Sequence, residues 1–184
     1  MRKSNAEAAE TREAIVAAAA DHLRRSGIAD SSLANMMAVA GLTQGGFYRH
    51  FRDKEQLVAE GLAAAGANTV ATLRRSLETG GMHAAVDSYL TRAHRDAAIP
   101  ICPFAALGSE IARSSDEVKA AAAAVLEELF VLFSNGDSAP GARAEAIVAL
   151  CTLVGAMTLS RVTGKTGLSD EILKQARHHL HELT

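Results

Sequence analysis

Hydrophobic residues recur along this chain with the period of an α-helix almost from end to end. Ile15, Ala19 and Leu23 recur every four positions, which places them on one helical face. Between residues 116 and 134 the apolar positions follow a 3.6-residue period, as in a helix packed against a core. Because the chain is also rich in alanine, the strongest helix former, we expect an all-α protein. The expected helices are 8–26, 33–40, 44–51, 53–79, 82–98, 104–113, 116–134, 140–163 and 169–183.

Glycines and small polar residues mark the ends of the short helices between residues 27 and 53. Gly27 ends the first helix, and Ser32 with its neighbours offers N-cap side chains for the second. Gly41 stands where a left-handed C-cap requires glycine. Thr43 and Asp53 can cap the next two helices. Two short helices joined by a tight turn within residues 31–56 predict a helix-turn-helix.

The second helix of this unit carries an unusual outward face. Phe47 and Phe51 lie four residues apart and form the apolar edge that packs inward. The opposite arc holds Gly45, Gly46 and Arg49. Two glycines in so short a helix cost about 1 kcal/mol each relative to alanine, and core packing does not require them there. A surface that must approach another molecule closely does require them, as in a recognition helix lying in the major groove of DNA.

Cations at the start of the following helix point to the same partner. Arg52 and Lys54 lie where the helix dipole is already positive, which is unfavourable unless a phosphate completes the site. The net charge of −2 does not by itself indicate nucleic acid, so this signal is local.

The run AGLTQGGFYRHFRDKEQL, residues 40–57, closely resembles the DNA-binding signature of the TetR family of transcriptional regulators. The preceding TREAIVAAAADHLRRSG resembles the first helix of that family, and CPFAALGSE at 102–110 is a weaker match to one of its branches. The resemblance implies a helix-turn-helix DNA-binding domain in residues 1–53 and a helical ligand-binding and dimerisation domain in residues 54–184. It further implies a homodimeric repressor that binds double-stranded, palindromic operator DNA and is released by a small-molecule effector.

Family roles transfer to the matching positions of this chain. Thr43 would cap the recognition helix and touch phosphate, and Lys54 would hold a phosphate at the next helix. Met37 replaces the usual alanine and Leu23 the common phenylalanine, and neither removes an expected DNA contact. The expected DNA-binding residues are Ser32, Thr43, Gln44, Gly45, Gly46, Tyr48, Arg49, His50 and Lys54.

The second domain offers a dimer seam and a set of apolar residues for a ligand. Small residues recur through positions 142–158 among large aliphatic ones, which favours a helix buried on both sides and a homodimer through the last two helices. Aromatic and sulfur side chains are usual linings of apolar ligand pockets, with Tyr89, His83 and His94 as polar handles. The candidate ligand-binding residues are Met82, Tyr89, Cys102, Phe104, Leu107, Phe130, Phe133 and Met157.

Other classes of function find little support in the sequence. No nucleophile motif, paired carboxylates, cofactor-binding loop or metal-ligand set occurs, so we expect no enzyme, no cofactor and no metal. Two cysteines and a longest uncharged helical run of only residues 146–160 suggest a cytoplasmic protein without a membrane span. Cys151 is expected to pack in the core. Two alternatives stay open: a thiol-based redox or electrophile sensor using Cys102, and a helical ligand-binding module without DNA function.

Overall fold

A computed structural model of the chain describes residues 5–137 and 139–183. Within that part the chain is helical, without strands. Its elements are α1 (Asn5–Ser26), α2 (Leu33–Val39), the 3₁₀ helix η1 (Gln44–Arg49), α3 (Lys54–Tyr89), α4 (Arg92–Asp96), α5 (Pro103–Ile111), α6 (Asp116–Phe133), α7 (Pro140–Val162) and α8 (Gly167–Leu183). The all-α expectation is therefore confirmed.

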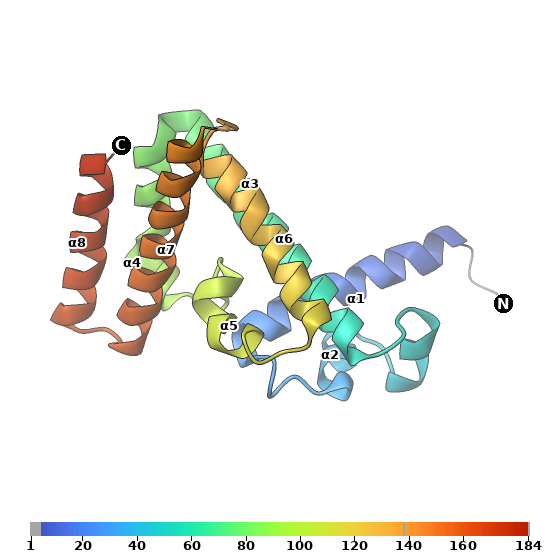
Figure 1. Cartoon of the computed structure of the whole chain (residues 1–184). Helices are drawn as coiled ribbons and strands as arrows, with labels where there is room; N and C mark the ends of the chain where they lie inside the picture. The colour runs from blue at the N-terminus through green and yellow to red at the C-terminus, as the bar shows by residue number, and fades with distance from the viewer. Residues whose placement is uncertain (1–4, 138, 184) are drawn as a thin grey trace.

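Two long helices connect the two ends of the molecule. α3 and α6 lie side by side across its middle, with α1, α2 and η1 at one end and the upright pair α7 and α8 at the other (Figure 1). The break expected near residue 80 is a kink within α3, where Gly80 has non-helical angles and Gly81 has φ +67°. Glycine tolerates that positive φ without the steric cost of a side chain.

Each end of the molecule has its own hydrophobic core. One core joins α1, α2 and η1 to the first half of α3, and it also includes Leu107 and Ile111 of α5 and Val118 of α6. The other joins the second half of α3 to α6, α7 and α8 around Leu129 and Leu153. The helix-turn-helix core therefore draws on residues far beyond position 53, which ties the short N-terminal helices to the rest of the chain.

α7 differs from the expectation of a helix buried on both sides. By length and composition alone, Gly141–Val162 could cross a membrane, but only 33% of its most apolar window is buried in the single chain. Val148, Leu159 and Val162 are more than half exposed, and Cys151, expected in the core, is exposed too. One side of α7 packs on the core, and the other is an apolar face that no described part of the chain covers.

Candidate DNA-reading surface

Local caps fix the first helix of the helix-turn-helix. The Ser32 hydroxyl accepts a hydrogen bond of 3.1 Å from the Asn35 amide, as an N-cap residue does. The chain then turns at Gly41, whose φ is +70°, and the Leu42 amide bonds back to the Met37 carbonyl at 2.9 Å. The positive φ explains why glycine is needed at position 41.

The second helix is a 3₁₀ helix and ends earlier than expected. η1 spans Gln44–Arg49, whereas the sequence predicted an α-helix over residues 44–51. Its hydrogen bonds span three residues, from the Gly46 amide to the Thr43 carbonyl and from the His50 amide to the Phe47 carbonyl. The adjacent glycines and the short length disfavour the regular α-helix, which gains stability only by propagating over more turns.

Two phenylalanines hold η1 against the domain core. Phe47 is completely buried, and its ring stacks on that of Phe51 with centroids 5.4 Å apart. Met36 and Met37 of α2 are also fully buried in this core, so methionine at position 37 is accommodated by packing. The Arg12 guanidinium lies over the Phe51 ring, 4.7 Å from its centroid. This inner face fixes how η1 presents its other side.

The opposite side of η1 is open. Apart from its chain neighbours, a Cβ atom added at Gly45 or Gly46 would meet no described atom within 4 Å, so packing among the described residues requires neither glycine. Tyr48 is 72% exposed, and Arg49 is exposed and makes no hydrogen bond or ion pair with the described residues. The backbone of Gly45 and Gly46 therefore forms a low surface, the glycine floor, on the side of η1 that faces away from the core. The exposed side chains of Tyr48 and Arg49 follow it in the same short helix.

The remaining expected DNA-binding residues differ in their exposure and in the element that carries them. Thr43 is exposed at the N-cap position of η1, but its hydroxyl makes no capping hydrogen bond, in contrast to the expected cap. His50 and Lys54 are half-buried, Lys54 as the first residue of α3. The backbone of Gln44 opens η1, and its side chain lies outside the described residues.

Arg52 differs from its sequence-based interpretation. Its guanidinium lies 2.7 Å from Asp53 and 2.6 Å from Glu117 of α6, so its charge is already compensated within the chain. The Asp53 carboxylate also caps α3 by accepting from the Gln56 amide at 2.9 Å, and this bond with the Arg52 contact lowers the pKa of Asp53. Arg52 therefore needs no phosphate to balance it, and Lys54 is the better candidate at this helix start.

Known proteins are similar in sequence to the same part of the chain, the segment that contains the helix-turn-helix. Residues 15–60 match the model of the family described as "Bacterial regulatory proteins, tetR family". The chain is 48% identical over 54 residues to the HTH-type transcriptional repressor BepR of Brucella suis, a segment covering 29% of this chain and 26% of BepR. It is 40% identical over 58 residues to the HTH-type transcriptional regulator TtgR of Pseudomonas putida, covering 32% and 28%. The matches thus span about a quarter of these relatives' length.

Solved structures match over nearly the whole chain. The reduced form of Escherichia coli NemR superposes with a TM-score of 0.76 at 21% identity, covering 93% of this chain and 95% of that one. A TetR transcriptional regulator from Legionella pneumophila gives 0.75 at 17% identity, covering 100% and 99%. At such identities these structures show the fold. The family match is confined to residues 15–60, so this N-terminal segment is similar to the tetR family of bacterial regulatory proteins, and the relatives matched over it are named as transcriptional regulators.

The candidate ligand-binding residues are distributed over several places. Met82 and Phe133 line two adjoining hollows of about 430 and 470 Å³ at the kinked end of α3. Tyr89, Cys102, Leu107 and Met157 are buried in the two cores. Phe104 and Phe130 are half-buried against them. The structure therefore does not gather the eight residues into one cavity.

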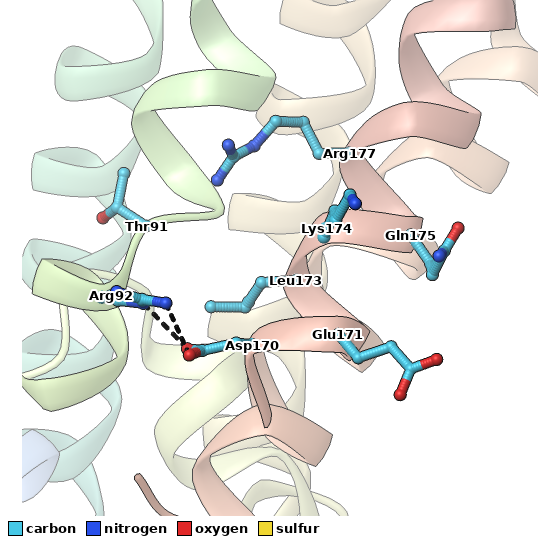
Figure 2. Close-up of a pocket in the computed structure, with 8 residues that line it drawn as sticks. All are labelled: Thr91, Arg92, Asp170, Glu171, Leu173, Lys174, Gln175 and Arg177. Carbon is cyan, nitrogen blue, oxygen red and sulfur yellow. Dashed lines mark hydrogen bonds and ion pairs between the residues drawn. The ribbon is translucent and has the colours of Figure 1, made fainter. Parts of the chain in front are cut away.

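One hollow is lined mostly by polar and charged residues. It has a volume of about 700 Å³ and lies between the start of α4 and one side of α8. Figure 2 shows Arg92 and Asp170 facing each other across it, while Glu171 and Gln175 point away. Arg92 donates two hydrogen bonds to Asp170, at 2.9 and 2.6 Å, so these charges are mutually satisfied. None of the expected ligand-binding residues lines this hollow, and its paired charges do not suit an apolar effector.

Cys102 lies in a closed, partly polar site. Its thiol is fully buried, and burial raises its pKa, while interaction with the Tyr89 side chain opposes that rise in part. The His94 ring packs on the edge of the Tyr89 ring at 4.6 Å, and its Nδ1 lies 2.9 Å from the Tyr89 carbonyl. A carbonyl only accepts, so Nδ1 carries the proton and Nε2 remains an acceptor without a recorded partner.

This environment predicts a thiol that does not react in the folded protein. Because the thiolate is the nucleophile and burial disfavours it, iodoacetamide at pH 7.5 should leave Cys102 unmodified in the native state. The Cys151→Ser variant removes the exposed cysteine, so mass spectrometry then reports on Cys102 alone. The same variant unfolded in guanidinium should be alkylated completely. Rapid modification of the native variant would contradict this account and favour a sensing thiol.

Proposed function

We propose that this chain is a DNA-binding transcriptional regulator that reads a palindromic operator as a homodimer, acts as a repressor and is released by a small-molecule effector. The observation that carries the proposal is the outward face of η1, where Gly45 and Gly46 leave open space next to Tyr48 and Arg49. The names of relatives, an HTH-type transcriptional repressor and an HTH-type transcriptional regulator, support the same class.

In this proposal the residues divide between bases and phosphates. Gln44, Gly45 and Gly46 open η1, and the start of a recognition helix lies nearest the base edges in a major groove. Arg49 has an exposed guanidinium that suits a guanine edge or a phosphate. We infer that the other expected residues contact the DNA backbone, which fixes the orientation of the helix but carries no sequence information. These residues lie within η1, at its ends or at the starts of α2 and α3: Ser32, Thr43, Tyr48, His50 and Lys54.

The dimer would form through the unpartnered apolar face of α7 and α8. Val148, Leu159 and Val162 on α7 are 52%, 56% and 77% exposed, and Leu168 and Leu183 on α8 are 56% and 59% exposed. Apolar side chains gathered on two antiparallel helices favour burial against a second copy. Two copies are also what a palindromic site requires, with one η1 for each half-site. Burial in such a dimer accounts for the apolar character of α7 in a cytoplasmic protein.

Residues 54–184 would form the effector-binding domain and residues 1–53 the DNA-binding domain, with Lys54 at their junction adding a phosphate contact. Among the expected lining residues, Met82 and Phe133 border open apolar space, and His94 Nε2 is a buried polar atom without a hydrogen-bond partner among the described residues. Such an atom is costly unless something binds it, so it is a suitable handle for a ligand that opens this core. The buried Cys102 makes the thiol-sensing alternative the weaker one.

A salt titration tests whether DNA phosphates are engaged. Lys54→Ala should weaken binding to all duplex sequences and reduce the slope of log affinity against log salt by about 1, because one phosphate contact is lost. Lys119→Ala is the matched control, since Lys119 is equally charged and lies on α6, outside the proposed DNA and dimer surfaces, with its side chain 47% exposed. Fluorescence anisotropy with a labelled duplex measures both slopes. A wild-type affinity that does not change with salt would contradict DNA binding and favour the alternative of a helical module without DNA function.

A further inference from the structure

A carboxylate from α5 holds the loop that precedes the helix-turn-helix. Oε2 of Glu110 accepts hydrogen bonds from the Ile28 amide at 2.7 Å and from the Ala29 amide at 2.9 Å. No other acceptor is recorded for these two amides among the described residues. Glu110 lies 82 positions along the chain from Ile28, in the domain that would bind the effector.

The loop is shaped around this carboxylate. Gly27 has φ +86°, and a Cβ at that position would lie only 2.8 Å from Glu110 Oε1. Glycine is therefore needed both for the backbone angle and for the approach of the carboxylate. The Ser31 hydroxyl closes the loop by donating to the Gly27 carbonyl, at 2.5 Å, and Ser32 then caps α2. Residues 27–32 thus connect the Glu110 carboxylate to α2, the first helix of the helix-turn-helix.

The opposite end of α5 is also tied to α1. The Arg24 guanidinium donates to the carbonyls of Pro100 and Ile101, at 3.0 and 3.2 Å, just before α5 begins. Its side chain is only 8% exposed. Between these two ties, Cys102 and Ala105 of the same segment pack into the core of the second domain. α5 is therefore the element in direct contact with both the effector-domain core and the loop before α2.

We propose that Glu110 is a positioning residue for DNA recognition, which sets the place of α2 and η1 through the amides of Ile28 and Ala29. The proposal rests on the proposed function. A carboxylate that accepts two amide hydrogen bonds is a strong and directional anchor. Any movement of α5 caused by a ligand in the second core moves this anchor, and with it the recognition helix.

If Glu110 acted only through its charge, its removal would change the DNA affinity in the opposite direction from loss of a positioning residue, so the two roles can be told apart. Removing a negative charge from a DNA-binding protein raises its affinity for phosphates in general. If Glu110 positions the helix-turn-helix, Glu110→Ala should instead lower the affinity for the specific duplex. The direction of the change therefore separates positioning from charge.

The test compares three variants of the full chain. Glu110→Ala removes the acceptor, and Glu110→Gln keeps an oxygen acceptor without charge. Glu128→Ala removes an exposed carboxylate of α6 that makes no hydrogen bond or ion pair with the described residues. The first readout is amide hydrogen exchange at Ile28 and Ala29 by NMR. The second is affinity for a palindromic duplex selected from a random pool by the wild type, with thermal unfolding as the check on folding.

We expect Glu110→Ala to speed exchange at both amides by about tenfold or more and to weaken specific binding by about tenfold, as the loss of a hydrogen bond would. Glu110→Gln should recover most of both losses, and Glu128→Ala should show neither. Faster exchange with unchanged or higher specific affinity would overturn the positioning role, as would unchanged exchange. If the wild type selects no duplex, the proposed function fails together with this inference, whereas wild-type selection with an unaffected Glu110→Ala defeats this inference alone.

Discussion

Gly45→Leu is expected to lower operator affinity by on the order of a hundredfold or more, because a leucine side chain would stand between η1 and the base edges it must approach. The Gly45→Leu substitution should not destabilise the fold. Apart from its chain neighbours, a Cβ at position 45 meets no described atom within 4 Å, and the φ of Gly45 is not in the positive range. Replacing glycine within a helix should even stabilise the protein by up to about 1 kcal/mol. A lower operator affinity together with an equal or higher melting temperature would indicate that position 45 lacks a side chain so that DNA can approach the backbone.

Ala124→Leu is the matched control for this experiment. Ala124 is an exposed small residue on α6, so the change adds a similar apolar side chain away from η1. It should leave both the melting temperature and the operator affinity close to those of the wild type. Gly45→Leu protein that binds DNA as tightly as the Ala124→Leu protein would show that the glycine floor does not face the bases.

Val148→Glu is expected to convert the protein to a monomer and to reduce operator affinity by about a hundredfold or more. Val148 is 52% exposed on the apolar face of α7, so a carboxylate is tolerated in the single chain but not in a contact between two copies. A dimer gains its affinity by binding the second half-site at high effective concentration, which multiplies affinity by roughly 10² to 10⁴. Analytical ultracentrifugation and anisotropy measure the two effects independently.

Val131→Glu provides the comparison. Val131 on α6 is 55% exposed, nearly the same as Val148, but it lies outside the α7 and α8 face. This variant should remain dimeric and bind DNA normally. If both variants stay dimeric, the α7 and α8 face is not the interface; if both dissociate, the effect is general destabilisation and not a local clash.

Helix positions were largely readable from the sequence because they depend on local signals. Apolar period, N-cap residues and the glycines at 27, 41 and 81 are properties of neighbouring residues, and each of these glycines has positive φ in the structure. The 3₁₀ form of η1 was not readable, since the balance between three- and four-residue hydrogen bonds in a six-residue helix depends on its packing. The exposure of Cys151 was missed for a related reason: an apolar stretch does not tell which of its sides the same chain covers.

The features of the candidate site that depend on neighbouring residues could be predicted from the sequence, whereas its contacts between residues far apart in the chain could not. The inward Phe47 and the outward glycines follow from helical periodicity alone. The pairing of Arg52 with Glu117 joins residues 65 positions apart, and the bond from Glu110 to Ile28 joins residues 82 apart. Such contacts depend on how α5 and α6 dock against the N-terminal helices, for which a single sequence carries no spacing rule. The phosphate role first assigned to Arg52 was lost for this reason.

The measurement that tests the central claim most directly is selection of duplexes bound by the full chain from a random pool, repeated with Gly45→Leu. The account predicts that the wild type enriches an inverted repeat with half-sites about one helical turn apart, and that the variant, equally well folded, enriches none. Recovery of no repeat by the wild type, or of the same repeat by both proteins, would contradict the claim that the open face of η1 reads DNA.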